Sequence, residues 1–365
     1  MSVQISFKKQ SLFGILFLIL LLLAIEISMA SYEYITIPCE LFQNEAFSNL
    51  SYFEIKNICY DTNTLTHGKA PLYHIVPQQH KFTMNINSDG FRGPEIHHNG
   101  DEKYRIFVTG GSTAFGFGST SDRTTITGNL QNIFDIHHED LNVEIINAGI
   151  NGADSYREIL LIKEKLFRFN PNMIISYTGL NDSGGYLQEI IFEEADDDWK
   201  PDALKFANYP WLRTPFVINK IITQDNVNQD TGKQPNLDEI PENVKAFKKN
   251  WLQSCSFLRD NGIKSIIILQ PVLVTKKSPS LFENESLLGD YPWRKAVLEN
   301  FSENLPLLNE ECDLTIDLRN GMDDTLETTY YDTGHMNDFG NGIIALKIYE
   351  KILPTILNDI DKIKD

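Results

Sequence analysis

Residues 103–357 alternate between short, continuously apolar runs and longer segments in which apolar residues recur every three or four positions. The short runs predict buried strands, and the longer segments predict amphipathic helices. Strands that are apolar throughout are typical of a parallel sheet covered by helices on both faces. The predicted strands are 104–109, 142–147, 173–177, 265–269 and 314–318, and the predicted helices are 124–137, 156–169, 241–261, 291–309 and 338–357.

Two segments do not follow this alternation. Residues 31–102 contain aromatic residues, two cysteines and a cluster of turn formers at 87–94, so we expect a lead-in that packs on the main domain. Residues 183–240 form a loop-rich insertion directly after a strand end, where it could cover the reaction site. A surface excursion with a solvated acidic patch is the alternative. The insertion carries the acidic run 193–198 and Trp199, Tyr209, Trp211 and Phe216.

The first thirty residues predict export. Lys8 and Lys9 precede an unbroken apolar run from Leu12 to Ile25, and small residues at 28–30 suit a signal peptidase. The run is short for a bilayer span of ~20 residues, which favours a cleaved signal peptide at 1–30. Tilt would instead allow residues 11–30 to stay as an N-terminal membrane anchor. With the lysines inside, the rest of the chain is secreted or membrane-anchored outside the cytoplasm.

Charge and cysteine content narrow the function further. The 365 residues carry 32 basic and 50 acidic side chains, a net charge of −18, without a basic cluster. This disfavours nucleic acid as a partner. Cys39 and Cys59 lie close together in the exported segment, so we expect a disulfide between them. Cys255 and Cys312 are expected to be buried free thiols. No Cys/His metal spacing exists, and no metal or other cofactor is predicted.

Candidate chemistry lies at the ends of the predicted strands. The strand 104–109 runs into Gly110-Gly111-Ser112, and glycines permit the sharp turn that displays a serine hydroxyl at a sheet edge. Near the other end of the chain, Asp332 and His335 are three residues apart, so the carboxylate can reach the imidazole N–H. The pattern predicts Ser112 as a nucleophile, His335 as its base and Asp332 as the residue that orients the base.

Two further pieces suit an oxyanion hole, which needs donors aimed at the oxygen that becomes negative. Residues 147–152 end the second strand with a glycine that can present its backbone N–H. Asn181 follows the third strand and can offer its side-chain amide. Reactive groups in open α/β sheets gather at the carboxyl ends of strands, so these pieces are expected to meet. The other histidines are in polar segments or lack a strand-end context, namely His67, His74, His80, His97, His98, His137 and His138.

The four pieces, in this order, resemble the SGNH hydrolase superfamily, also called GDSL esterases/lipases, whose markers are a serine, a glycine, an asparagine and a histidine. The resemblance covers roughly residues 103–355. It implies a three-layer α/β/α sandwich with a central parallel sheet, the flavodoxin-like fold. It also implies that the oxyanion donors are the N–H groups of Ser112 and Gly152 and the amide of Asn181, with Gly149 as a structural glycine.

Two local features qualify the resemblance. The stretch 87–95 is similar to the segment before the first block in membrane-attached members. The usual Gly-Asp-Ser of the family is Gly110-Gly111-Ser112 here, so the hydrogen bonds around the serine are expected to differ.

The predicted reaction is hydrolysis of an ester through an acyl-serine intermediate. The expected substrate carries an O-acetyl or short acyl group on an envelope or extracellular polysaccharide. A lipid substrate is an alternative. The alternatives are O-acyl transfer to a glycan by the same residues and a catalytically silent glycan-binding protein of the same fold.

Overall fold

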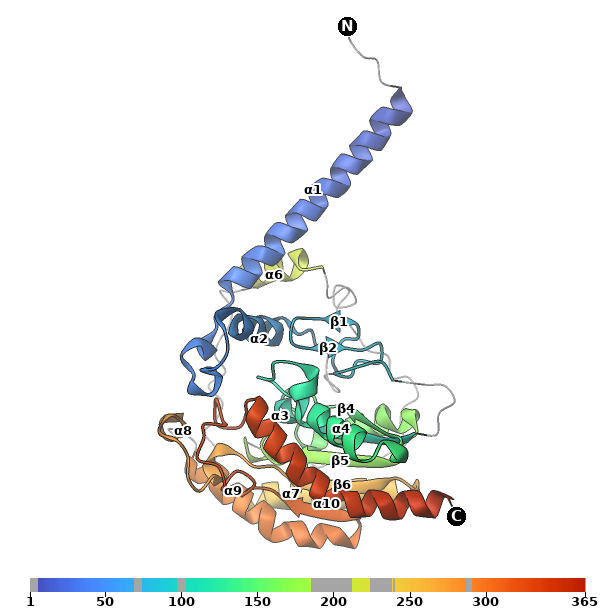
Figure 1. Ribbon diagram of the computed structural model, residues 1–365, viewed down its shortest axis with the longest axis vertical. Helices are drawn as coiled ribbons and strands as arrows, with labels where there is room; N and C mark the ends of the chain where they lie inside the picture. The colour runs from blue at the N-terminus through green and yellow to red at the C-terminus, as the bar shows by residue number, and fades with distance from the viewer. Residues whose placement is uncertain are drawn as a thin grey trace.

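The body of the molecule is a parallel sheet between two layers of helices (Figure 1). The computed structural model describes residues 6–68, 74–96, 103–184, 212–223, 238, 240–286 and 291–364. Within these ranges the sheet has five strands in the order β4-β3-β5-β6-β7, and every neighbouring pair is parallel. The strands are β3 (Tyr104–Gly110), β4 (Val143–Asn147), β5 (Met173–Thr178), β6 (Lys264–Leu269) and β7 (Leu314–Asp317).

Alternate side chains of each strand enter two separate cores. Ile106 belongs to one core and Phe107 to the other, because successive side chains of a strand point to opposite faces. The core around Phe107 is closed by α5 (Ser155–Glu164), α7 (Ile240–Asp260) and α9 (Tyr291–Asn304). The core around Ile106 is closed by α4 (Ile126–His137) and α10 (Asp338–Lys364). The predicted three-layer α/β/α sandwich is therefore confirmed.

The predicted strands and helices recur with small changes at their ends. The segment predicted as one helix over 156–169 is α5 followed by a short 3-10 turn at Leu166–Phe169, and 291–309 is divided in the same way after α9. The last helix continues beyond the predicted end at 357 to Lys364, through Pro354. The short helices α3 (Ser112–Phe115) and α8 (Leu281–Ser286) complete the body.

The strand order places a reversal point beside β3. Numbered along the chain, the strands lie in the order 2-1-3-4-5, the order of doubly wound sheets of the flavodoxin type. The connection after β3 leads to one side of it and the connection after β4 leads to the other. Ligands of such sheets bind at the carboxyl ends of the strands where this reversal occurs. A ligand of this fold is therefore expected to bind at the loops after β3, β4 and β5.

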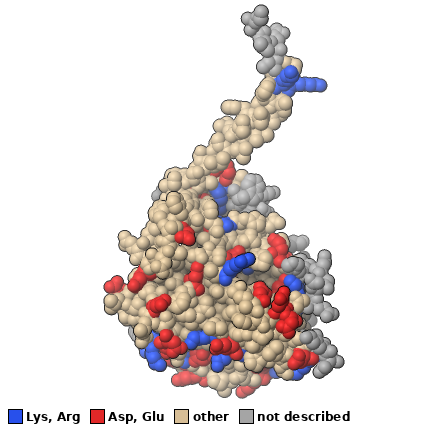
Figure 2. Space-filling view, in the orientation of Figure 1, with Lys and Arg blue, Asp and Glu red and all other residues tan. Residues whose placement is uncertain are grey.

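The N-terminal helix α1 (Phe7–Thr36) extends away from the body (Figure 1). Its surface is uncharged between basic side chains near its tip and acidic ones at its base (Figure 2). Large apolar side chains are exposed along its length, from Leu12 at 64% to Ile25 at 42%. In the described part of the chain, α1 is the one helix long and apolar enough to cross a membrane. This is compatible with a signal peptide or a signal anchor.

The lead-in lies between α1 and the body (Figure 1). It contains α2 (Tyr52–Thr64) and two antiparallel strands, β1 (Gln79–His80) and β2 (Asn85–Ile86). Hydrogen bonds join it to the C-terminal part of the chain: the Asn44 amide donates to the carbonyl of Tyr331 at 2.7 Å, and the Asn337 amide donates to that of Ala46 at 3.0 Å. The domain boundaries at 30, 102 and 357 stay predictions.

Part of the insertion 183–240 is described. Helix α6 (Thr214–Thr223) lies within it and carries Phe216. The acidic run 193–198 and the residues Trp199, Tyr209 and Trp211 lie outside the described residues.

All four cysteines form disulfides. The predicted bond between Cys39 and Cys59 is confirmed. The prediction that Cys255 and Cys312 are free thiols is wrong, because they form a second disulfide with their Cα atoms 4.8 Å apart. Cys255 on α7 and Cys312 before β7 enter the same core. The two cysteines are 57 residues apart in the sequence, and their pairing could not be inferred from it because it depends on how α7 packs on the sheet.

The disulfide between Cys255 and Cys312 is expected to stabilise the fold. Replacing both residues by alanine removes a covalent link across 57 residues and should lower the free energy of unfolding by about 2–5 kcal/mol. Urea unfolding of oxidised wild type and of the double variant measures this difference. A double variant as stable as oxidised wild type would contradict the expectation. The variant in which Cys39 and Cys59 are replaced by alanine is the matched comparison, because it loses the other disulfide.

Candidate active site

The turn between β3 and α3 has no room for side chains at its two glycines. Gly110 has a φ of +146°, and a Cβ there would overlap the carbonyl oxygen of Tyr177. A Cβ on Gly111 would overlap the side-chain amide of Asn181. Glycine is thus required at Gly110 if the neighbouring strand end is to stay where it is, whereas a Cβ at Gly111 would chiefly displace the end of the Asn181 side chain. The tight turn brings Ser112 to the end of the strand, and the Asn181 amide occupies the space beside Gly111.

Ser112, His335 and Asp332 form a continuous hydrogen-bonded chain. His335 Nε2 lies 2.6 Å from Ser112 Oγ, and His335 Nδ1 lies 2.7 Å from Asp332 Oδ2. The other carboxylate oxygen of Asp332 accepts from the backbone N–H groups of Gly334 and His335 at 2.8 and 2.7 Å. With the ring proton on Nδ1 facing the carboxylate, Nε2 is an acceptor for the serine hydroxyl. The arrangement can take a proton from Ser112.

The charge of Asp332 suits this geometry. Partial burial works to raise the pKa of Asp332, but the hydrogen bond and charge of His335 and the backbone N–H donors outweigh it and hold the pKa below its ordinary value. Asp332 therefore stays ionised and can stabilise a protonated imidazole. The ring of Tyr331 stacks on that of His335 with centroids 5.5 Å apart and an interplanar angle of 16°, which limits how the imidazole can turn.

The expected oxyanion donors lie around the same cavity. Ser112, Gly152, Asn181 and His335 line a hollow of about 480 Å³. Gly152 has a φ of +70° with open space where a Cβ would stand. The Asn181 amide donates one hydrogen to the carbonyl of Ala153 at 2.8 Å, which orients the group and leaves a second N–H on the same nitrogen. By contrast, a Cβ on Gly149 would overlap the backbone of Phe115, so Gly149 serves packing.

A buried carboxyl group supports the loop that carries Asn181. Asp182 accepts hydrogen bonds from the backbone N–H of Ser155 at 2.9 Å and from the Thr178 hydroxyl at 3.1 Å. Burial raises the pKa of Asp182 to about 6. Glu158 lies in the same buried region, where it accepts from the Thr109 hydroxyl at 2.8 Å, and burial together with the Asp182 charge raises its pKa well above the ordinary value. Both groups tie strand ends to α5.

Sequence reasoning missed the role of Arg92. Its guanidinium is fully buried and donates to the carbonyl oxygens of Gly116 at 2.7 Å and Thr83 at 2.9 Å, while its Nε pairs with Asp122 at 2.8 Å. It thus holds the end of the short helix that begins with Ser112. The turn-rich stretch 87–94 marked the position of this arginine, but no pattern indicated its partners.

A second missed group fixes the chain just before Asp332. Lys276 and Glu283 form an ion pair at 2.7 Å with both side chains 0% exposed. Glu283 also accepts from the backbone N–H groups of Thr329 and Tyr330 at 3.0 and 3.1 Å. No sequence signal distinguished this pair, because lysine and glutamate are typical of the solvated surface.

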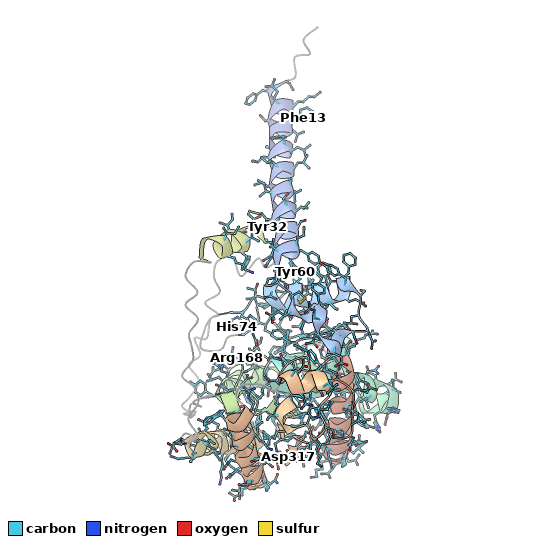
Figure 3. The ribbon with its side chains drawn as sticks, turned by 90° about the vertical axis from the view of Figure 1, so that its left-hand side faces the viewer. Phe13, Tyr32, Tyr60, His74, Arg168 and Asp317 are labelled. Atoms are coloured by element: carbon cyan, nitrogen blue, oxygen red, sulfur yellow. A yellow bond between two sulfur atoms is a disulfide. The ribbon has the colours of Figure 1, made fainter. Side chains whose placement is uncertain are left out.

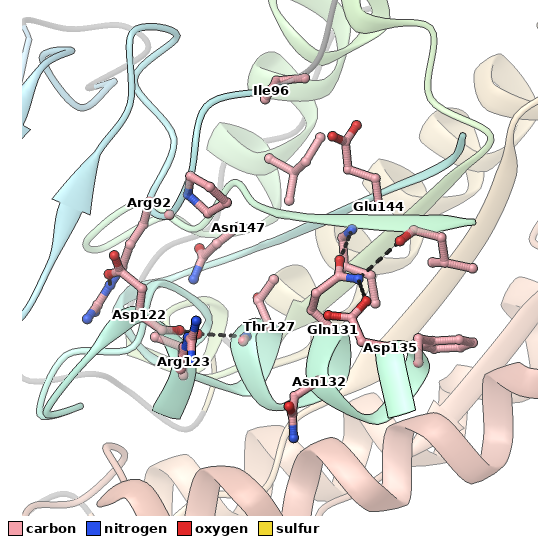
Figure 4. Close-up of a pocket in the computed structure, with 18 of the residues that line it drawn as sticks. Arg92, Ile96, Asp122, Arg123, Thr127, Gln131, Asn132, Asp135, Glu144 and Asn147 are labelled. Atoms are coloured by element: carbon pink, nitrogen blue, oxygen red, sulfur yellow. Dashed lines mark hydrogen bonds and ion pairs between the residues drawn. The ribbon is translucent and has the colours of Figure 1, made fainter. Parts of the chain in front are cut away.

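A larger hollow of about 880 Å³ lies between the segment 85–96, α4 and the edge strand β4 (Figure 4). Gln131 donates to the carbonyl of Val143 at 3.0 Å and accepts from the N–H of Ile145 at 2.6 Å, which satisfies polar groups of an otherwise open strand edge. His138, which lines this hollow, bonds the Tyr349 hydroxyl and not a serine. The hollow therefore lacks the proton-transfer geometry found at Ser112.

Among the described residues, no group of three His, Cys, Asp or Glu side chains is placed to hold a metal ion. The functional side-chain groups in the smaller cavity are two hydroxyls, an imidazole, three carboxyl groups, one amide and two guanidinium groups. Their arrangement suits nucleophilic attack and proton transfer.

Comparison with known proteins found similar structures only. No family model matches the chain, and no curated protein does. An acetyl xylan esterase, AlAXEase, aligns with a TM-score of 0.41 and 15% identity over 68% of this chain and 99% of its own. An acetylxylan esterase from Geobacillus stearothermophilus gives 0.43 and 13% over 70% and 96%. An alpha/beta hydrolase from the metagenome of Lake Arreo, Spain, gives 0.41 and 10% over 69% and 96%. The assignment of the fold rests on the sheet and helices of the chain itself.

The pKa of Asp182 predicts a pH dependence of stability. Because it is raised from 3.8 to about 6, the folded protein holds a proton that the unfolded chain has lost between these values. The free energy contributed by Asp182 therefore falls as pH rises through this window and is constant above it. The variant Asp182→Asn does not titrate, so its stability relative to wild type should rise from pH 4 to pH 6 in urea unfolding. A difference that is independent of pH would show that Asp182 titrates normally.

Proposed function

We propose that this protein is a serine esterase in which Ser112 attacks the ester carbonyl and forms an acyl-serine intermediate. The observation that carries the proposal is the unbroken hydrogen-bonded chain from Ser112 Oγ through His335 to Asp332. A serine hydroxyl is a weak nucleophile until a positioned base accepts its proton, and His335 Nε2 is within reach at 2.6 Å. This chain opens into a cavity that also holds Asn181 and Gly152.

Each group has a distinct part in the proposed reaction. His335 accepts the hydroxyl proton as Ser112 Oγ bonds to the carbonyl carbon, and Asp332 stabilises the resulting imidazolium. The N–H groups of Ser112 and Gly152 and the amide of Asn181 donate to the oxyanion. His335 then gives the proton to the leaving alcohol as the carbon–oxygen bond breaks. Water gives a proton to His335 as its oxygen bonds to the acyl carbon; the bond from that carbon to Ser112 Oγ then breaks, His335 returns the proton to Oγ, and the acid leaves.

The lining of the cavity favours a polar substrate. Apart from the reacting groups, its polar side chains are Asp154, Arg157, Asp182, Arg294 and Thr333, and Leu180 is the apolar one. Arg157 is held beside Gly152 by a hydrogen bond from its Nη1 to the carbonyl of that residue at 3.0 Å. Such a lining suits a short acyl group carried on a hydrogen-bonding alcohol, such as a sugar, better than a long apolar chain. Together with the predicted export, this supports an O-acetylated or short-acylated glycan outside the cytoplasm as the substrate.

The first test compares p-nitrophenyl esters of short and long acids with the full-length protein in detergent. We expect acetate to be preferred and Ser112→Ala to lower kcat by about 10⁴–10⁶, since the triad acts as a unit. Ser121→Ala is the matched control, because the Ser121 hydroxyl lies by Thr124 and outside the small cavity. If an added sugar takes the acyl group in place of water, the protein is a transferase. No serine-dependent reaction at all would refute the esterase and leave a glycan-binding protein.

Asn181 tests the oxyanion hole separately. Asn181→Ala removes one of the proposed donors and should lower kcat roughly 10²–10³-fold with a small change in KM, because the bond strengthens only in the transition state. Steady-state kinetics on the acetate ester measures both constants. A rise of KM by the same factor, with kcat unchanged, would instead assign Asn181 to substrate binding. An unchanged melting temperature should accompany the variant as its control for folding.

A further inference from the structure

The helix α6 is attached to the base of α1 by polar contacts at its first turn. Glu26 of α1 accepts hydrogen bonds from the backbone N–H groups of Thr214, the first residue of α6, and of Arg213 just before it. These are N–H groups that a helix cannot satisfy internally, and a carboxylate also suits the positive end of the helix dipole. Residues nearly two hundred positions apart in the chain are thus joined where α1 leaves the body.

A buried ion pair reinforces this attachment. The Arg213 guanidinium donates from Nε and Nη2 to the two carboxylate oxygens of Glu33 at 2.8 and 2.7 Å. The side chains of Arg213 and Glu33 are 10% and 7% exposed. A two-point contact of this kind fixes orientation as well as distance. Glu26 and Glu33 are seven residues apart and lie on the same face of α1, so α6 is held against two turns of it.

The same part of α1 is bound to the lead-in. The Tyr34 hydroxyl donates to Asn57 of α2 at 2.9 Å, and Lys56 donates to the carbonyl of Ile37 at 2.7 Å. Signal cleavage after Ala30 would cut α1 between Glu26 and Glu33 and remove the carboxylate that caps α6. The contacts of Glu33, Tyr34 and Ile37 would survive such cleavage, so it is the Glu26 cap alone that favours a retained helix.

Helix α6 also exposes apolar side chains, with the charged Lys220 exposed between them. Val217 is buried, whereas Ile218 is 43% and Ile221 53% exposed. Figures 1 and 3 show α6 crossing beside the lower part of α1, on the side of α2 that faces away from the sheet. Tyr32 of α1 lies at the level of α6 in Figure 3 and is 50% exposed. Tyrosine and short amphipathic helices are both typical of the membrane–water interface.

We propose that α1 is retained as a membrane anchor and that α6 lies in the outer membrane–water interface beside it, with Ile218 and Ile221 in contact with lipid. The occupant of the apolar face of α6 is lipid because α6 packs directly beside α1, whose apolar segment is unburied and long enough to cross a membrane. Two helices in contact with the bilayer restrict the tilt of the body more than one flexible anchor does. The proposal is independent of the ester chemistry.

The contact of α6 with lipid can be measured by fluorescence quenching. All four native cysteines are in disulfides, so Ile221→Cys introduces the single free thiol for an environment-sensitive dye. The labelled full-length protein is reconstituted in phosphatidylcholine vesicles that contain lipids with a nitroxide near the headgroup. The matched control is Leu357→Cys, a residue 37% exposed on the last half of α10, which lies far from α1 (Figure 1).

Quenching at position 221 should exceed quenching at position 357 roughly threefold or more, since an interfacial helix lies within reach of the nitroxide. Equal quenching at the two positions would overturn the interfacial placement. Efficient disulfide crosslinking between two copies of the unlabelled Ile221→Cys variant, without lipid quenching of the labelled one, would overturn it in favour of an interface between copies of this chain.

A second measurement tests whether the anchor is retained. The intact mass of the membrane-extracted protein should include residues 1–30, and a mature chain that begins at Ser31 would refute the anchor.

Discussion

The close approach of three loops at the carboxyl end of β3 is the constraint on which the rest of the site depends. Gly110, Gly111 and Gly149 each lie where a Cβ would overlap a neighbouring loop or helix. Because these positions carry no side chain, the loop after β5 can place Asn181 beside the start of α3, and the loop after β4 can pack on α3. The reversal of strand order at β3 brings these loops to one edge of the sheet. A side chain at Gly110 or Gly149 would push neighbouring backbone away, and one at Gly111 would displace the Asn181 amide.

Hydrogen bonds from buried polar groups hold these loops in place. Arg92 binds the end of α3, Asp182 supports the loop that carries Asn181, and Glu283 fixes the chain just before Asp332. Burial of each charge is costly unless hydrogen bonds compensate it, so each group strongly favours one arrangement of its loop. The lead-in contributes in the same way, because Asn44 binds the backbone of Tyr331, whose ring stacks on His335. The site is therefore preorganised by Asp182, at the edge of the cavity, and by residues that do not line it, among them Arg92 and Glu283.

The surface of the body differs in character from that of α1 and α6. Charged side chains are scattered over the body and absent from the middle of α1 (Figure 2), whereas α1 and α6 expose apolar side chains. The pair of Glu33 and Arg213 stands at the boundary between them, buried and bound at two points. In the proposed arrangement, the anchor orients the cavity relative to the membrane and leaves the ester chemistry to the body. Substrates on an extracellular glycan would then be met close to the membrane surface.

The sequence by itself determined the sheet-and-helix alternation and the four strand-end pieces, since apolar periodicity and glycine-rich turns are local properties. It also placed Asp332 next to His335, because three residues suffice for that contact. Only the tertiary structure decided the pairing of Cys255 with Cys312, the partners of Arg92 and the attachment of α6 to α1. Each of these joins residues far apart in the chain, and their geometry depends on how helices pack on the sheet. Local pattern does not encode that packing, so no reading of the sequence alone would have found them.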